Sequence, residues 1–227
     1  MKISGLQKNS FVDYPGKISA VIFTPGCNMD CFYCHNRILL DSNYQKLISC
    51  DDVLNFLENR KGFLDGVVVS GGEPTLQKGL LPFLNHVKSL GYPIKLDTNG
   101  TNPEVVKSCL DKGLVDYISM DFKAPLNKYK DICRTDVELG NIEKSVDLII
   151  NSGINYEFRT TLAPGLNVDD IVEIAKQIRG AKLYVLQRCR NEKGEGLSYS
   201  AEFINSWLRE IKGIVNSVET RGMSFSA

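Results

Sequence analysis

KISAVIFTPGCNMDCFYCHN, residues 17–36, joins an apolar, β-branched run to a loop that holds three cysteines and a histidine. KISAVIFT (17–24) has the composition of a buried strand. The cysteines that follow have the spacing C-x3-C-x2-C, whereas the other cysteines of the chain are isolated. A strand that ends in chemically reactive side chains is typical of α/β folds, in which functional groups gather at the carboxyl ends of parallel strands.

The rest of the chain alternates strands and helices. We predict further strands at GVVVS (66–70), PIKLDT (93–98), DYISMDFK (116–123), NYEFRTTL (155–162), KLYVLQ (182–187) and, in short form, SVET (217–220). Predicted helices lie at 49–61, 80–90, 102–113, 142–151, 169–178 and 201–211. Repeated strand–helix units predict a parallel sheet with right-handed crossovers.

Two architectures fit this alternation of strands and helices. A closed eight-fold barrel typically needs about 250 residues, and the chain has 227. We therefore predict an α/β fold with an incomplete (βα)6-type TIM barrel. A doubly wound open sheet is the alternative, because periodicity does not separate the two. We expect a single domain over 1–227, with a core barrel at about 17–187 and a C-terminal helix and last strand at 200–221.

Composition and charge exclude several classes of function. Lysine plus arginine and aspartate plus glutamate number 27 each, so no bulk charge favours nucleic acid or an anionic membrane as a partner. No apolar run approaches the roughly 18 residues of a membrane span, and MKISGLQKNS (1–10) lacks the apolar core of a signal peptide. We therefore expect a cytoplasmic protein whose thiols stay reduced.

The clustered thiols are Cys27, Cys31 and Cys34. An odd total of seven cysteines in a reducing compartment favours a metal site over a disulfide framework. Three thiolates suit a [4Fe–4S] cluster with one iron left without a protein ligand. A zinc site is the alternative, with a distant fourth ligand such as Cys50. His35 adjoins the third cysteine, which is an awkward position for binding the same ion.

Other candidate site residues lie at the ends of the later predicted strands. They are Gly71, Gly72 and Glu73 in GGEP (71–74), Asp97 and Thr98 in DTNG (97–100), Ser119, Asp121 and Lys123 in SMDFK (119–123), Arg159 in FRTT (158–161), and Gln187. Glycines let a ligand approach the backbone closely. The loop RNEKGEG (190–196) is expected near the same mouth, as a lid or a substrate contact.

The charged residues of SMDFK point to ligand binding. Asp121 and Lys123 are two residues apart on a strand, so both face the same side together with Ser119. Charges that face a barrel interior need a partner or a ligand. We expect Lys123 to neutralise a ligand carboxylate and Arg159 to make a second anion contact. Asp121 would accept from a ribose hydroxyl or hold a cation, with hard oxygen ligands also at the end of the neighbouring strand.

These motifs together resemble those of the radical S-adenosylmethionine (radical SAM) superfamily, and within it the branch that activates glycyl radical enzymes. The stretches that carry the resemblance are FVDYPGKISAVIFTPGCNMDCFYCHN (11–36), SGGEPTLQ (70–77), KLDTNG (95–100), VDYISMDFKAP (115–125), FRTTLAPG (158–165) and YVLQ (184–187). DYPGKI (13–18) stands where pyruvate formate-lyase activating proteins usually have a DGPGIR-like sequence. The chain is therefore most similar to activating proteins of anaerobic ribonucleoside-triphosphate reductase.

The resemblance implies a set of cofactor contacts. One [4Fe–4S] cluster would be held by Cys27, Cys31 and Cys34, and its fourth iron would bind the amino and carboxylate groups of SAM. The implied SAM contacts are Tyr33 beside the adenine, Gly71, Gly72 and Glu73 at the methionine amino end, and Lys123 at the carboxylate. Asp121 would lie near the ribose or near a monovalent cation shared with Asp97, Thr98 and Ser119.

The resemblance also implies a reaction. One electron would cleave SAM to methionine and a 5′-deoxyadenosyl radical, which would take a hydrogen atom from a glycine of a partner enzyme, anaerobic ribonucleotide reductase. The electron would come from a reduced flavodoxin or a ferredoxin-type protein. Two alternatives stay open: a small-molecule radical SAM enzyme, such as a deazapurine-forming synthase, and a zinc-stabilised binding protein without catalytic activity.

Overall fold

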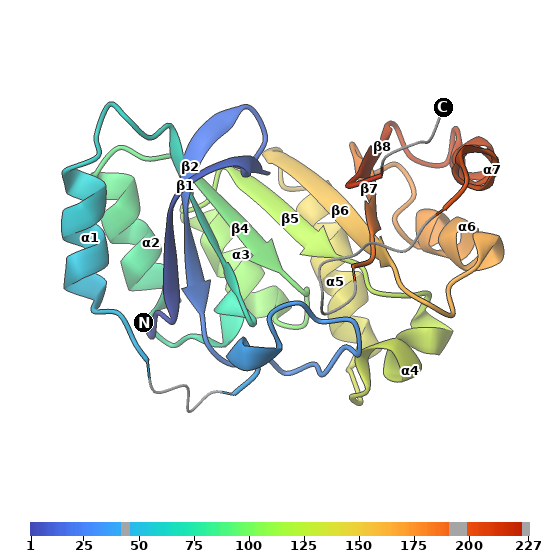
Figure 1. Cartoon of the computed structure of the whole chain (residues 1–227), viewed down its shortest axis with the longest axis horizontal. Coiled ribbons are helices and arrows are strands. Elements are labelled where there is room, and N and C mark those ends of the chain that lie inside the picture. The colour runs from blue at the N-terminus through green and yellow to red at the C-terminus, as the bar shows by residue number, and fades with distance from the viewer. Residues whose placement is uncertain (42–45, 191–198, 224–227) are drawn as a thin grey trace. The chain divides into compact units, whose positions relative to one another are not determined.

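The computed structural model of the chain describes residues 1–41, 46–190 and 199–223 (Figure 1). Its strands are β1 (Gly5–Tyr14), β2 (Lys17–Thr24), β3 (Gly66–Gly71), β4 (Ile94–Thr98), β5 (Tyr117–Asp121), β6 (Asn155–Leu162), β7 (Tyr184–Arg188) and β8 (Val218–Arg221). Its α-helices are α1 (Cys50–Glu58), α2 (Leu80–Ser89), α3 (Pro103–Asp111), α4 (Tyr129–Cys133), α5 (Leu139–Ile150), α6 (Val168–Gln177) and α7 (Ala201–Ile211). The short 3₁₀ helices are η1 (Arg37–Leu39), η2 (Pro74–Leu76) and η3 (Leu126–Lys128).

The strand order decides between the two predicted architectures. The strands of the described residues form one eight-stranded sheet whose order follows the chain from β1 to β8. A doubly wound sheet reverses its direction of winding at a switch point, so its strand order does not follow the chain. Sequential order, with helix after each strand from β2 to β7, confirms the predicted α/β fold of the partial-barrel type. The doubly wound alternative is therefore wrong.

Neighbouring strands that are connected by a helix pair in parallel, in each pair whose register is resolved. β2 pairs in parallel with β3, β3 with β4, β6 with β7, and β7 with β8. The predicted final strand is confirmed as β8. The last α-helix, α7, has the predicted bounds 201–211. By contrast, α5 begins at Leu139, three residues earlier than the predicted 142.

β1 is a strand that the sequence pattern did not indicate. It pairs antiparallel with β2 at one edge of the sheet, after a tight turn in which Gly16 has a φ of 71°. Its apolar residues do not alternate with polar ones: Phe11 is 75% exposed and Val12 is 80% exposed. Among its apolar residues only Tyr14, at its end, is buried in the core, so hydrophobic periodicity carries little signal for this strand.

The described chain divides into two compact units. The first consists of Met1–Asn28, Asn36–Thr98 and Asn102–Ser119, and its core includes buried residues of β2, β3 and β4. The second consists of Met29–His35, Asn99–Thr101 and Met120–Ala227, and its core includes buried residues of β6, β7, α5 and α6. The expected single domain over the whole chain stays a prediction.

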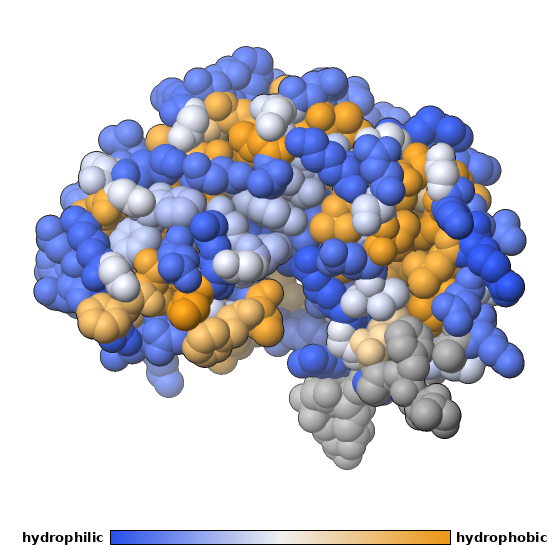
Figure 2. All heavy atoms as spheres, turned by 90° about the horizontal axis from the view of Figure 1, so that it is seen from above, coloured by the Kyte–Doolittle hydropathy of each residue, from blue (hydrophilic) through white to orange (hydrophobic). Residues whose placement is uncertain are grey.

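Apolar side chains reach the surface in several places. Figure 2 shows hydrophobic residues in groups that hydrophilic residues separate, on the face seen from above. The most exposed large apolar residues outside β1 are Ile38 and Phe63, both 71% exposed. Single exposed apolar residues are ordinary on proteins. Within the described residues, no helix has the length and apolar character needed to cross a membrane.

Candidate active site

The two glycines at the end of β3, Gly71 and Gly72, pack against the segment that leads into the cysteine loop. Gly72 N donates to the carbonyl of Thr24, and Glu73 N donates to the carbonyl of Gly26, each at 2.8 Å. Gly71 has a φ of 125°, and a Cβ there would collide with the backbone of Thr24. A Cβ on Gly72 would collide with the backbone of Gly26. Only glycine fits both positions, so close backbone packing is one reason for the GG pair.

Glu73 is buried within the first unit, and its carboxylate is held by hydroxyl groups. It is 1% exposed, and its Oε1 accepts from Thr75 Oγ1 at 2.6 Å and from Thr98 Oγ1 at 2.8 Å. The backbone N of Thr75 also donates to Oε1, at 3.1 Å. Thr98, which the sequence placed among possible cation ligands, therefore lies at the end of β4 as a hydrogen-bond donor to Glu73.

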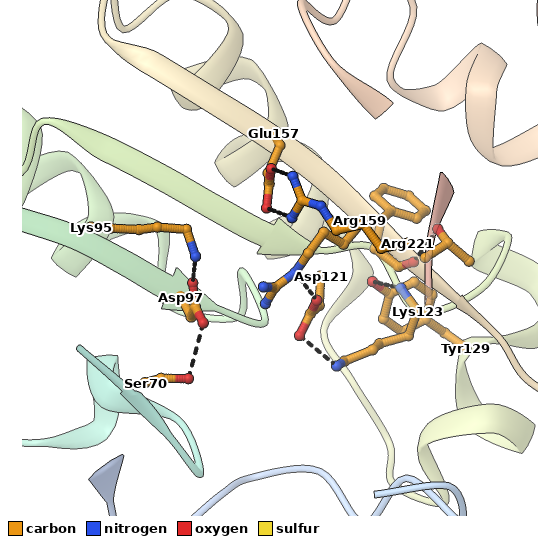
Figure 3. A network of polar contacts seen from close by, with 11 residues as sticks. Ser70, Lys95, Asp97, Asp121, Lys123, Tyr129, Glu157, Arg159 and Arg221 are labelled. Atoms are coloured by element: carbon orange, nitrogen blue, oxygen red, sulfur yellow. Dashed lines mark hydrogen bonds and ion pairs between the residues drawn. The ribbon is translucent and has the colours of Figure 1, made fainter. Parts of the chain in front are cut away.

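Asp97 is paired with a lysine that sequence reasoning missed. Lys95 Nζ lies 2.5 Å from Asp97 Oδ1, and Ser70 Oγ donates to Asp97 Oδ2 at 3.0 Å (Figure 3). Lys95 and Asp97 are two apart on β4, so they share a face, as spacing alone would have shown. The lysine is 1% exposed, which makes it one of the largest fully buried side chains described.

In the second unit, Asp121 lies between two cationic groups. Its Oδ2 is 3.0 Å from Lys123 Nζ and its Oδ1 accepts from Arg159 Nε at 2.8 Å (Figure 3). Burial raises the pKa of Asp121, but the charges of Arg159 and Lys123 outweigh burial and hold that pKa well below its usual value. Burial lowers the pKa of Lys123, but the Asp121 carboxylate more than offsets this, so the ammonium stays charged. One carboxylate therefore contacts two cations.

The cysteine loop of the second unit brings Cys31 close to these charges. A hydrogen bond with Cys133 is the largest cause that lowers the pKa of Cys31 to about 7; burial opposes it and the charge of Lys123 assists it. Tyr33 has a buried hydroxyl without a hydrogen-bond partner among the described groups, and burial raises its pKa. Cys31 is therefore prepared to become a thiolate, and Tyr33 stays a neutral phenol.

A short segment after β5, which sequence reasoning missed, holds this loop. Asp30 N donates to the carbonyl of Cys133 at 2.9 Å and to Thr135 Oγ1 at 3.2 Å. Arg134 has a φ of 51° and is, among the described residues, the one non-glycine with positive φ. Its guanidinium lies 5.4 Å from the centre of the Phe32 ring, a cation–π distance. α4 has only five residues, too few for helical periodicity to reveal it.

Replacing Cys133 with alanine should raise the pKa of Cys31 from about 7 towards that of an unperturbed thiol, about 8.5, because the hydrogen bond that lowers it most is removed. In the wild type, the lowered pKa means that the thiolate form of Cys31 prevails above pH 7. In the Cys133→Ala variant, less thiolate is present at pH 7, so Cys31 of the apo-protein should be alkylated several-fold more slowly than in the wild type. Site-resolved mass spectrometry after brief alkylation measures this rate. Cys109, whose pKa burial raises to about 11, serves as the internal reference. An unchanged rate at Cys31 would contradict the hydrogen bond.

The remaining predicted site residues lie where their strands place them. Ser119 is fully buried on β5, and Gln187 lies on β7 in register with Thr161 and Arg221. Cys27 belongs to the first unit and lines a cavity of about 550 Å³. The other lining residues include Gly26, Leu40, Leu76, Gln77 and Lys78. Most of the predicted loop RNEKGEG, residues 191–196, lies outside the described residues.

The donor chemistry of the loop fits an iron–sulfur cluster. None of Cys27, Cys31 and Cys34 forms a disulfide with another described residue, and Cys34 N donates to the carbonyl of Cys31 at 3.0 Å. Thiolates are the ligands of iron–sulfur clusters, and Cys31 has the lowered pKa that a ligand needs. No three histidine, cysteine, aspartate or glutamate side chains in the described ranges are already gathered as a metal site. The fit therefore rests on the donor set.

Comparison with known proteins identifies the family. The model of the Radical SAM superfamily matches residues 21–178. A protein of Methanocaldococcus jannaschii, provisionally named a glycyl-radical enzyme activating enzyme, is 39% identical over 193 residues, which are 82% of this chain and 79% of the relative. Pyruvate formate-lyase-activating enzyme of Clostridium pasteurianum is 28% identical over 219 residues, 91% of this chain and 85% of that enzyme.

A solved structure supports the same assignment at the level of the fold. SuiB of Streptococcus suis, in the crystal structure bound to S-adenosylmethionine, superposes with a TM-score of 0.66 at 12% identity. The match covers 88% of this chain and 51% of SuiB, so the chain spans about half of that protein. Fold, cysteine motif and family model agree. The chain belongs to the radical SAM superfamily and is an enzyme of that class.

Proposed function

We propose that this enzyme installs a glycyl radical on a partner protein. The observation that carries the proposal is the 39% identity to the glycyl-radical enzyme activating relative over 82% of the chain. The similarity to pyruvate formate-lyase-activating enzyme over 91% of the chain supports it. With Cys27, Cys31 and Cys34 as its ligands, a [4Fe–4S] cluster would supply the electron that cleaves SAM to methionine and a 5′-deoxyadenosyl radical.

The charge balance around Asp121 supports a role in binding SAM. Lys123 and Arg159 both contact Asp121, and the ammonium of Lys123 is charged in a largely buried position. A carboxylate is a ligand that such a buried ammonium prefers. We infer that Lys123 contacts the methionine carboxylate of SAM and that Arg159 orients Asp121. Asp121 keeps the ammonium of Lys123 charged and holds both cations in place.

The other end of the methionine and the adenine have candidate contacts as well. Glu73 is a buried carboxylate whose orientation is fixed by three donated hydrogen bonds. The Glu73 carboxylate would accept a hydrogen bond from the amino group of SAM, beside the backbone of Gly71 and Gly72. Tyr33 has a buried hydroxyl that lacks a partner, which an adenine or a ribose would supply.

The partner and the electron donor are proposed from the resemblance. DYPGKI (13–18) favours anaerobic ribonucleotide reductase over pyruvate formate-lyase as the partner. A reduced flavodoxin or ferredoxin-type protein would supply the electron in a cytoplasmic setting. Family membership argues against the zinc-stabilised binding protein. The small-molecule radical SAM enzyme stays the rival, because fold and cofactor do not determine what is attacked.

The test is activation of a partner under anaerobic conditions. The reconstituted enzyme is incubated with SAM, a reductant and purified anaerobic ribonucleotide reductase, and electron paramagnetic resonance detects the radical. We expect an organic radical that is absent when the partner's radical glycine is replaced with alanine. Formation of 5′-deoxyadenosine without a protein radical on this or any other glycyl radical enzyme would favour the small-molecule rival. An enzyme that forms no 5′-deoxyadenosine would contradict the whole proposal.

A further inference from the structure

We propose that the ammonium group of Lys95 is the built-in counter-ion of Asp97, so that this carboxylate takes no monovalent metal ion. The sequence had placed Asp97 among the ligands of such an ion. The inference goes beyond the proposed function, because it concerns how the enzyme holds one carboxylate and not which substrate it attacks.

Both carboxylate oxygens of Asp97 already have a partner from the protein. Lys95 Nζ is 2.5 Å from Oδ1, and Oδ2 accepts from Ser70 Oγ at 3.0 Å. Figure 3 shows the three side chains in one line of contacts from β3 to β4. Each carboxylate oxygen therefore has a cation or a donor from the protein itself. The residues present do not fit a bound metal ion at this position.

Burial of Lys95 makes the arrangement hard to displace. Its side chain is 1% exposed, and its neighbour across the ladder on β3 is Val68. The aromatic ring of Tyr117 lies 6.0 Å from Nζ and adds a weak cation–π attraction. A metal ion that replaced the ammonium at Asp97 would leave a buried, unpaired charge, and breaking a buried pair in this way is strongly destabilising. A tethered ammonium also competes at a high effective concentration with any dissolved ion.

The inference predicts how the protein responds to different monovalent cations. Wild-type protein should behave alike in potassium, sodium and choline chloride at equal ionic strength. Replacing Lys95 with methionine keeps a stem of similar length and removes the charge. Asp97 would then be a mostly buried carboxylate beside a space that a potassium or ammonium ion fills.

Thermal unfolding of the apo-protein tests this without any cofactor. We expect the wild-type midpoints in the three salts to agree within about 1 °C. A change of roughly 0.5 kcal/mol in the free energy of unfolding would shift the midpoint by more than that. Lys95→Met should unfold several degrees lower in choline chloride and recover in potassium or ammonium chloride. The double variant Lys95→Met with Asp97→Asn should lose this selectivity between salts. Lys88→Met, which breaks the half-exposed pair with Asp116, is the matched control and should show no selectivity.

Binding of thallium(I), a spectroscopic substitute for potassium, gives a second readout by nuclear magnetic resonance. The wild-type apo-protein should show no thallium-binding site that is lost when Asp97 is replaced with asparagine. A wild-type site that disappears in Asp97→Asn, or a potassium-specific rise of the wild-type midpoint lost in that variant, would overturn the proposal. Equal midpoints of Lys95→Met in all salts would overturn it as well. If Lys95→Met does not fold, the wild type and Asp97→Asn still decide, and none of these results depends on SAM cleavage or on the partner.

Discussion

Replacing Cys31 with alanine is expected to abolish reductive cleavage of SAM. Cys31 is a proposed ligand whose thiolate form is favoured, because a hydrogen bond with Cys133 and the charge of Lys123 lower its pKa to about 7. Removing a group that merely supports a metal ligand costs about 10- to 100-fold, and removing a ligand should exceed that range. We expect the iron and sulfide content of the anaerobically reconstituted variant to fall with its formation of 5′-deoxyadenosine, as measured by chromatography.

Cys109→Ala is the matched control for this prediction. Cys109 is also a fully buried thiol, but it lies on α3, and burial raises its pKa to about 11. The variant should keep its iron and its activity, although it loses some stability through the small cavity. If Cys109→Ala lost iron to the same extent as Cys31→Ala, or if Cys31→Ala kept full iron, the assignment of cluster ligands would be wrong.

The strands and the residues at their ends were predictable because both depend on local pattern. GVVVS is an apolar run of strand length that leads into the GGEP motif. NYEFRTTL has the aromatic and β-branched residues of a strand and holds Arg159. Asp121 and Arg159 were expected at the ends of neighbouring strands, and they are found in contact at 2.8 Å. Parallel strands bring their carboxyl ends to one edge, so strand assignment alone places such residues together.

Other contacts were not predictable because they join segments distant in the sequence. Asp30 contacts Thr135 across 105 residues, and Thr98 contacts Glu73 across 25. No periodicity encodes which hydroxyl will reach which carboxylate. Lys95 is a different case, because its spacing from Asp97 was visible. It was missed because a lysine inside an apolar strand runs against the usual preference of lysine for the surface.

Asp121→Asn should produce the largest loss of stability among single changes at the site. Asp121 neutralises two largely buried cations, and without its charge Lys123 and Arg159 repel each other at close range. Loss of one partner from a buried pair costs about 3 to 5 kcal/mol, and the partial exposure of Asp121 places the expected loss near about 3 kcal/mol. Urea unfolding of the apo-protein at pH 7 measures the loss. Affinity for SAM should also fall, because the position of Lys123 depends on Asp121.

The lowered pKa of Asp121 predicts how its contribution to stability changes with pH. The pKa of Asp121 is lower in the folded protein than in the unfolded chain. Its contribution to stability is therefore complete above the unfolded value, about 3.9, and is lost as the pH falls through the folded value. Wild type and Asp121→Asn should differ by a constant amount between about pH 5 and pH 8 and converge in stronger acid.

Two further variants separate charge balance from the loss of a side chain. Asp121→Asn combined with Lys123→Met removes the repulsion between the two cations, so it should recover part of the lost stability but none of the affinity for SAM. Asp111→Asn removes the same charge from the exposed pair with Lys107 and should leave the urea midpoint unchanged. A single variant Asp121→Asn as stable as wild type would show that Lys123 and Arg159 do not need a counter-ion. The role of Asp121 in positioning the Lys123 ammonium for a carboxylate would then lose its physical basis.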